Sequence, residues 1–293
     1  MRNFSTLLLG LALLSSLLAT EMHLTSAKAA LQETPIPTEQ SITDAQGVEM
    51  NFVPAGSFQM GYTLNQYLSL CSEFQPINTG LRICSPPNEK LILMPHRVEM
   101  GSFYIDTYEV SIGAYTACVE SGGCSEEILK RQLTAQIDMP IVRINVYEAE
   151  IYCNWRNAHL PTEEEWEYAA AGTENFTFPW GNTFDGTKVN VCDASCSMQV
   201  IANQNWNDGY SDIAPIQAFE TDRSWVGAYN LGGNVAEWTS TRVYIDDLGN
   251  DLHIVKGSAS ITYAFYAASW TRIAVVALSQ QTHVGFRCAR MTR

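Results

Sequence analysis

The chain has 293 residues, a length that fits one large domain or two small ones. Apolar residues make up 46% of it and charged residues 16%, which predicts a packed core. The formal net charge of -14 disfavours nucleic acid and anionic membranes as partners, and it is compatible with an exported protein and with cation binding.

The first 29 residues have the pattern of a secretory signal peptide. An apolar run from Leu7 to Leu18 is too short to span a bilayer, and an Ala-x-Ala cleavage site follows it at Ala27–Ala29. We expect cleavage there, with earlier cleavage near Ala19 as the alternative. The protein is then periplasmic or extracellular and has no membrane anchor. Residues 30–44 are polar and contain proline, which predicts a disordered lead-in.

Eight cysteines in an exported chain favour disulfides over metal sites. Three close pairs are expected to be local bridges: Cys71 with Cys84, Cys118 with Cys124, and Cys192 with Cys196. The remaining two, Cys153 and Cys288, would close a loop over most of the domain. A loop of that length gives the largest entropic stabilisation, about 4–5 kcal/mol in the chain-entropy model.

In chain order, short strands are predicted first, at 50–53, 57–61, 95–100 and 103–106, with an insertion loop over 62–94. Three helices follow, and each begins at a capping residue: Ser111, Asn145 and Thr162. The last two have a glutamate three residues later, at Glu148 and Glu165, which completes a capping box.

The acid-rich start of the third helix is therefore given a structural role and no catalytic one. Residues 178–228 predict long ordered loops, which in a compact domain are usually functional or fixed by a metal. Short strands are expected again at 254–257 and 285–289.

The stretch from Asn230 to Thr241 carries the clearest ligand pattern. Two adjacent glycines allow a sharp turn, and Asn230 and Glu237 offer side-chain oxygens at its two ends. Oxygen ligands on such a turn suit a hard cation such as calcium. The alternative is a buried turn that precedes a core strand bearing a tryptophan.

A series of short motifs runs through the whole chain after the lead-in. They are Phe52-Val53-Pro54-Ala55-Gly56, Phe58-Gln59-Met60-Gly61, Pro95-His96-Arg97-Val98, Glu109-Val110-Ser111, Tyr152-Cys153-Asn154-Trp155, Leu160 to Ala171, Phe178 to Asn182, Asn230 to Thr239, and Gly285-Phe286-Arg287-Cys288. In this order they resemble the formylglycine-generating enzyme (sulfatase-modifying factor) domain family over residues 45–293. The resemblance implies a compact, loop-rich α+β fold related to C-type lectins, with few short strands and three main helices.

The resemblance also implies two calcium sites. The ligands of the first would be Asn190, the Val191 carbonyl, Asp208 and the Tyr210 carbonyl. The ligands of the second would be Asn230, the Gly233 and Val235 carbonyls, and Glu237. The family's bridge between the second helix and the last strand falls on Cys153 and Cys288.

The family's catalytic copper(I) is held between two cysteines, and this chain departs from that pattern. The two positions fall on Thr262 and Ala267, and neither side chain binds copper(I). A relocated copper pair at Cys192 and Cys196 is the alternative to their disulfide. The histidines form no cluster that suggests iron chemistry.

Three functions are compatible with these residues. The first is an exported, calcium-stabilised domain without formylglycine-generating activity and without copper, which binds a peptide, glycan or protein in the family's groove or carries out non-copper chemistry; the sequence does not decide between this function and the second. The second is an oxidative tailoring enzyme like the periplasmic pyoverdine-maturation relatives. The third, the family's own oxidation of sulfatase cysteines, is disfavoured by Thr262 and Ala267.

Overall fold

The structure, a computed structural model, describes residues 41–74, 92–243 and 251–292. All of them belong to one compact unit, Ile36–Arg293. The predicted signal peptide, most of the predicted lead-in and Cys84 lie outside the described ranges. No helix within those ranges is long and apolar enough to cross a membrane.

The two ends of the described chain meet in one antiparallel sheet. Its strand order is β1 (Ile42–Thr43), β2 (Glu49–Val53), β5 (Phe103–Asp106) and β10 (Ala289–Met291). β1 and the buried Asp44 lie in the segment that was predicted to be disordered, and Asp44 accepts a hydrogen bond of 2.8 Å from Arg156. This ion pair anchors Asp44 at the start of the turn 45–47, so ordered structure is already present before residue 45.

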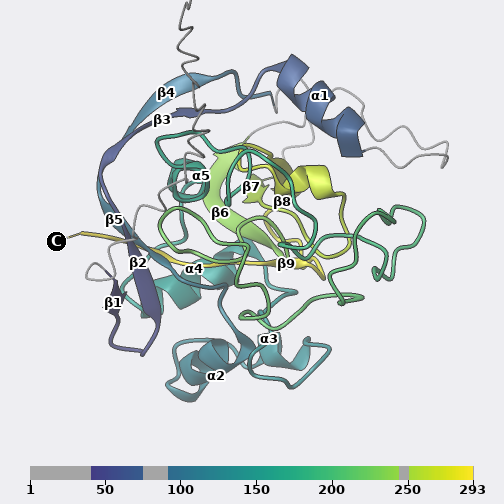
Figure 1. Ribbon diagram of the computed structural model, residues 1–293. Helices are drawn as coiled ribbons and strands as arrows, with labels where there is room; N and C mark the ends of the chain where they lie inside the picture. The colour runs from purple at the N-terminus through teal and green to yellow at the C-terminus, as the bar shows by residue number, and fades with distance from the viewer. Residues whose placement is uncertain (1–40, 75–91, 244–250, 293) are drawn as a thin grey trace, which may run out of the picture. The chain divides into compact units, whose positions relative to one another are not determined.

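A second antiparallel pair, β3 (Gly56–Met60) and β4 (His96–Met100), arches over the outside of α5 (Figure 1). Between these strands in sequence lies α1 (Leu64–Phe74), and this helix corrects the predicted insertion loop. Its start is capped reciprocally, since Gln66 accepts from the Thr63 amide and Thr63 accepts from the Gln66 amide. Its apolar face packs against the short 3-10 helix η3 (Ala264–Ala267).

The three predicted helices are confirmed as α2 (Ile112–Glu120), α4 (Val146–Trp155) and α5 (Glu163–Ala171). Ser111 caps α2, and both predicted capping boxes are present at α4 and α5. A further single-turn helix, α3 (Glu127–Lys130), was not predicted. The caps succeed as predictors because they depend only on neighbouring residues.

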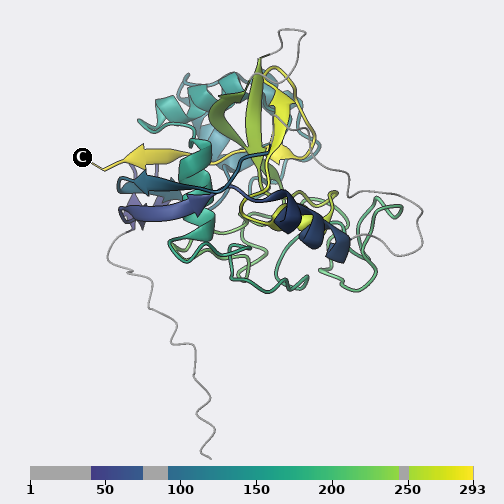
Figure 2. The same cartoon turned by 90° about the horizontal axis from the view of Figure 1, so that it is seen from above.

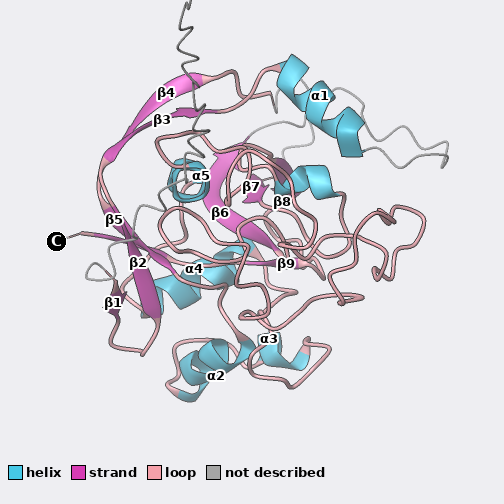
Figure 3. Ribbon diagram, in the orientation of Figure 1, coloured by secondary structure: helices cyan, strands magenta, loops and turns pink. Residues whose placement is uncertain are grey.

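A third sheet forms the centre of the domain, with strand order β8-β7-β6-β9. Its members are β6 (Ala236–Val243), β7 (Leu252–Lys256), β8 (Ile273–Val276) and β9 (Val284–Gly285). Between α5 and β6 the chain has neither helix nor strand, as predicted, and Figure 3 shows this segment as continuous loop. Figure 2 shows it along the side of the domain opposite β6–β8.

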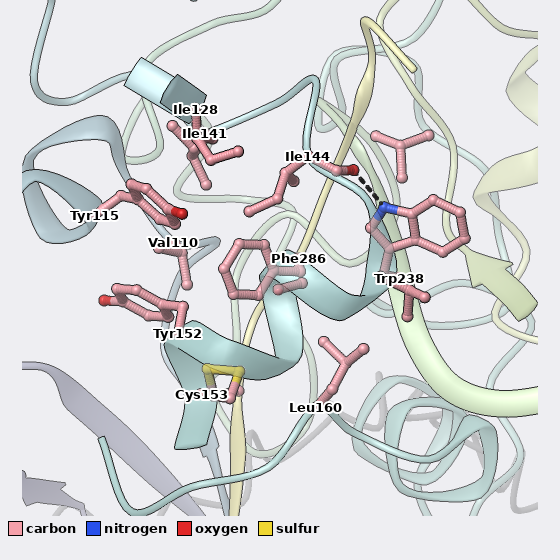
Figure 4. Packing of buried hydrophobic residues seen from close by; sticks show 14 of the residues in the cluster. Val110, Tyr115, Ile128, Ile141, Ile144, Tyr152, Cys153, Leu160, Trp238 and Phe286 are labelled. Atoms are coloured by element: carbon pink, nitrogen blue, oxygen red, sulfur yellow. Dashed lines mark hydrogen bonds between the residues drawn. A yellow bond between two sulfur atoms is a disulfide. The ribbon is translucent and has the colours of Figure 1, made fainter. Parts of the chain in front are cut away.

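The main core lies between α4 and this central sheet. Phe286 is fully buried there and meets Tyr152 of α4 edge to face at 5.4 Å (Figure 4). Trp238 of β6 is also buried and donates its indole hydrogen to the Ile144 carbonyl at 2.9 Å. The buried tryptophan keeps its polar atom satisfied, as a large core aromatic requires.

The predicted disulfides are confirmed where both partners are described. They are Cys118–Cys124, Cys153–Cys288 and Cys192–Cys196. Cys71 is also disulfide-bonded, but its predicted partner lies outside the described ranges. The Cys153–Cys288 bond joins α4 to the segment before β10 and so links the main core to the terminal sheet.

Candidate functional site

Residues 230–237, here the 230–237 turn, lead directly into β6. Its left-handed positions are Asn230 (φ 60°) and Asn234 (φ 67°), whereas its two glycines have no positive φ. Glycine is required there for close approach. A Cβ on Gly233 would lie 2.4 Å from the Asn190 carbonyl oxygen, and one on Gly232 would lie 2.6 Å from Trp180. The turn is therefore shaped by what packs against it.

The acid of this turn, Glu237, is fully engaged by protein donors. Arg287 donates from Nε at 2.8–3.0 Å to both carboxylate oxygens and from Nη2 at 2.6 Å to Oε1. Trp166 donates from Nε1 to Oε2 at 2.7 Å. All three side chains are buried. The carboxylate predicted to bind calcium is thus neutralised by an arginine from the last motif of the chain.

Two further buried acids support the turn, and sequence reasoning missed both. Glu109 accepts from Asn230 Nδ2 at 2.7 Å and from Asn234 Nδ2 at 3.0 Å, and Asp222 accepts from the Gly232 amide. Burial raises the pKa of Glu109 to about 7, and it raises the pKa of Asp222 well above the usual range. One atom of the turn is left over: Asn230 Oδ1 is buried and has no partner among the described residues.

The other predicted calcium ligands lie together in residues 190–210, here the 190–210 loop. Asp208 accepts at Oδ1 from the Tyr210 amide at 2.8 Å and also accepts from the Val191 amide. Its Oδ2 is buried without a partner in the described chain, and so is Oδ1 of the fully buried Asn190. Burial raises the pKa of Asp208 to about 6, and the neighbouring Asp193 acts in the same direction.

Around Ser195, this loop has more hydrogen-bond acceptor oxygens than the serine hydroxyl can donate to. The Ser195 hydroxyl oxygen lies 2.6 Å from Asp193 Oδ1, 2.7 Å from the Tyr210 carbonyl oxygen and 3.1 Å from Asp208 Oδ1. A hydroxyl has a single hydrogen, so it can satisfy only one of the three. Asp193 and Ser195 were not predicted as site residues.

The two loops touch. Asn190 donates from Nδ2 to Asn234 Oδ1 at 3.1 Å, and Asn234 donates its amide to the Asn190 carbonyl at 2.9 Å. No group of three or more His, Cys, Asp or Glu side chains suited to a metal occurs within the described ranges. Any ion here would therefore need amide and carbonyl oxygens as well, which is the ligand mixture that calcium accepts.

The 190–210 loop fits calcium better than the 230–237 turn does. It holds two partnerless buried side-chain oxygens, from Asn190 and Asp208, and a crowded set of acceptors around Ser195. The turn holds one partnerless oxygen, and its carboxylate already has a cation in Arg287.

Of the two predicted copper positions, Thr262 precedes η3 and Ala267 is its last residue. The Thr262 hydroxyl closes its own turn: it accepts from the Ala259 amide at 2.9 Å and lies 2.7 Å from the Ser258 hydroxyl. Ala267 is fully buried in an apolar cluster with Phe178 and Phe265. Neither position presents a polar atom to an open site.

Ser269 and Trp270, which follow η3 in the chain, line a pocket of about 120 Å³. Its lining includes Gln59, Gln66, Glu167, Asn175, Ser269 and Trp270. Glu167 is neutralised by the buried Lys256 at 2.7 Å, so the polar lining has no excess charge. The Ser269 hydroxyl is buried and has no partner among the described side chains and backbone.

The Sulfatase-modifying factor enzyme 1-like domain family matches residues 37–292. The chain belongs to this family. Among relatives, it is 32% identical over 160 residues to inactive C-alpha-formylglycine-generating enzyme 2 of Bos taurus, covering 53% of this chain and 51% of that protein. It is 27% identical over 252 residues to formylglycine-generating enzyme of Bos taurus, covering 66% and 67%. The chain thus spans about half the length of the first of these relatives.

Solved structures agree with membership of the sulfatase-modifying factor family at the level of fold. PvdO from Pseudomonas aeruginosa matches with a TM-score of 0.62 and 21% identity, covering 86% of this chain and 98% of that one. CarF matches with a TM-score of 0.54 and 15% identity, covering 85% and 100%. The predicted fold class, mixed helix and sheet with long loops, is confirmed.

Within the sulfatase-modifying factor family, this chain retains the scaffold that its motifs predict. Its turn, helices and final Gly285–Cys288 motif all take their expected places, and that motif supplies Arg287 to the turn. Glu109 and Arg287 lie in motifs that the sequence displays, so their importance was detectable. Their contacts to the turn were not.

Proposed function

We propose that this chain is an exported, calcium-stabilised member of the sulfatase-modifying factor family that binds a ligand and does not oxidise cysteine with copper. The observation that carries the proposal is the environment of Thr262 and Ala267. The Thr262 hydroxyl is hydrogen-bonded within its own turn, and Ala267 is buried in an apolar cluster. A relative named as inactive supports the idea that the fold persists without the activity.

The chemistry of copper(I) supports the same view. This soft ion prefers two thiolates. The Cys192 amide donates to the Thr262 carbonyl at 3.0 Å, so the Cys192–Cys196 pair lies beside one of the two positions. Those two sulfurs are bonded to each other and are not thiolates.

In this proposal calcium has a structural role in the 190–210 loop. Asn190, the Val191 carbonyl, Asp208 and the Tyr210 carbonyl would hold it, and the bound ion would supply positive charge to oxygens that lack hydrogen-bond donors. Calcium at the 230–237 turn stays a prediction. There, Glu237 would first have to give up part of its contact with Arg287.

The pocket beside Trp270 is the proposed contact point for a ligand. Its neutral amides and its aromatic wall suit the uncharged polar end of a peptide or glycan. The signal-peptide pattern supports export, which would place this ligand outside the cytoplasm.

The deciding experiment is an oxidation assay on the purified mature chain. A Cys-x-Pro-x-Arg peptide is incubated with the protein, copper and oxygen, and the peptide mass is followed. Conversion of the thiol to an aldehyde removes one sulfur and two hydrogens and adds one oxygen. We expect no such product here, whereas an active family member run in parallel should form it. Its appearance with this chain would overturn the proposal.

A further inference from the structure

We propose that the disulfide-closed segment 192–196 is part of the calcium site, with Ser195 as a ligand and Asp193 as the residue that positions it. This inference rests on the proposed calcium site in the 190–210 loop. It assigns a role to residues that the motif pattern does not mark, and it explains why a disulfide spans only four positions there.

The Ser195 hydroxyl lies among three acceptor oxygens, of which it can donate a hydrogen to only one. Its hydroxyl oxygen is within 3.1 Å of Asp208 Oδ1 and the Tyr210 carbonyl oxygen, two of the expected ligands. An ion bound between those oxygens would also meet the lone pairs of the hydroxyl, which is a neutral oxygen donor of the kind that calcium accepts. The hydroxyl then donates its hydrogen to Asp193 Oδ1, 2.6 Å away.

Asp193 holds both halves of the site. Its Oδ1 accepts from the Ser195 amide at 2.8 Å and from the Ser195 hydroxyl, and its Oδ2 accepts from the Asp208 amide. Asp193 is fully buried, so these contacts fix its orientation. With Asp208 it also brings two carboxylates to the loop, enough to balance a divalent ion.

The disulfide keeps these two side chains in place. Cys192 and Cys196 bracket Asp193 and Ser195 in sequence, and both cysteines are buried in a small cluster with Ala202. Without the bond, the segment between them would be free to sample other conformations. Ligand positioning of this kind usually changes metal affinity by about 10–100-fold.

The test is calcium titration calorimetry on the oxidised mature chain and its variants. We expect S195A to weaken calcium binding about tenfold, the equivalent of one lost contact of about 1.4 kcal/mol. S195T, which retains the hydroxyl, should restore most of the affinity. We expect D193N and the double variant C192A/C196A to weaken binding by about 10–100-fold.

The matched control is C118A/C124A, which removes another short-range disulfide, at the end of α2. It should leave calcium affinity within about twofold of the parent chain. Thermal unfolding in chelator separates folding from binding: S195A should be slightly less stable than the parent there, because it lacks the hydroxyl hydrogen bond, and the difference should widen when calcium is added.

The outcomes are distinguishable. A parent chain that binds no calcium would overturn the proposed calcium site together with this inference. A parent chain that binds calcium while S195A and D193N bind equally well would overturn the inference alone. If C192A/C196A does not fold, S195A and S195T still decide the role of Ser195.

Discussion

The 190–210 loop and the 230–237 turn have the same kinds of predicted calcium ligands, but the charges around their acidic side chains differ. Each was predicted to offer one asparagine, one acid and two carbonyls to calcium. In the turn, Arg287 reaches Glu237 from a distant motif and neutralises it inside the protein. In the loop no arginine or lysine forms an ion pair with Asp208 among the described residues, and its Oδ2 has no partner.

A ligand motif therefore predicts which oxygens come together, but it does not predict whether a basic side chain or a metal ion neutralises them. A carboxylate that stays ionised in a low-dielectric interior requires a countercharge, whether it is a guanidinium or a metal ion; an unpaired one instead has a raised pKa, as Glu109 has. The turn has its countercharge built into the chain. The loop would obtain it from solution. Four measurements test whether this contrast between the loop and the turn holds.

The largest effect is expected from removing the internal cation of the turn. R287M leaves Glu237 buried and unpaired, which should lower the free energy of unfolding by about 3–5 kcal/mol in urea denaturation. The control is R242M, which removes an exposed arginine paired with Asp251 and should cost less than about 1 kcal/mol. Equal losses in the two variants would contradict the role given to Arg287.

The next largest effect is a pH dependence of the free energy of unfolding, caused by Glu109 beside the 230–237 turn. Glu109 has a folded pKa of about 7, above its unfolded value, so the folded chain binds a proton more tightly. The resulting stability is complete below the unfolded pKa and is lost as the pH rises to about 7, by roughly 3 kcal/mol. Urea denaturation in chelator between pH 4 and about 8 measures the slope.

E109Q carries no titrating proton and should flatten that slope, while Asp222 continues to contribute in the same direction. The same slope in E109Q and the parent chain would remove Glu109 from the explanation.

A smaller effect is expected from calcium at the loop. At a free concentration 100 times the dissociation constant, calcium should add about 2.7 kcal/mol to the free energy of unfolding. D208N should abolish this gain because it removes the charged ligand. D185N, at a nearby exposed acid bonded to Thr187, should retain it. A gain that survives in D208N would place the ion elsewhere.

The smallest effect is expected from calcium at the turn. Because Arg287 already holds Glu237, titration calorimetry should give one strongly bound ion per chain, and E237Q should leave its affinity unchanged. Two strongly bound ions would show that the turn can release its arginine, and the contrast between the two regions would then be one of degree.

The sequence allowed prediction wherever a structure depends on neighbouring residues. The caps at Asn145 and Thr162 are of this kind, and both helices begin there. The start of α1 has the same kind of signal, a threonine at 63 and a glutamine at 66, but the surrounding insertion obscured it.

The rest depends on contacts between residues far apart in the chain. Glu237 and Arg287 are separated by 50 positions, and Glu109 lies 121 positions from Asn230. A motif can mark such residues as important without stating which of them will pair. The surplus of oxygens around Ser195 likewise exists only once Asp193, Asp208 and Tyr210 have been folded together.

The Cys192–Cys196 bond has a practical consequence for handling the protein. Through the Cys192 amide it lies beside the segment of Thr262. Reducing agents in a purification buffer would turn this bond into a dithiol beside that segment. Two thiols are the ligands that copper(I) prefers, so we expect such a preparation to bind copper(I) more tightly than the oxidised protein does. Metal analyses should therefore be made on samples whose free thiol content has first been shown to be zero.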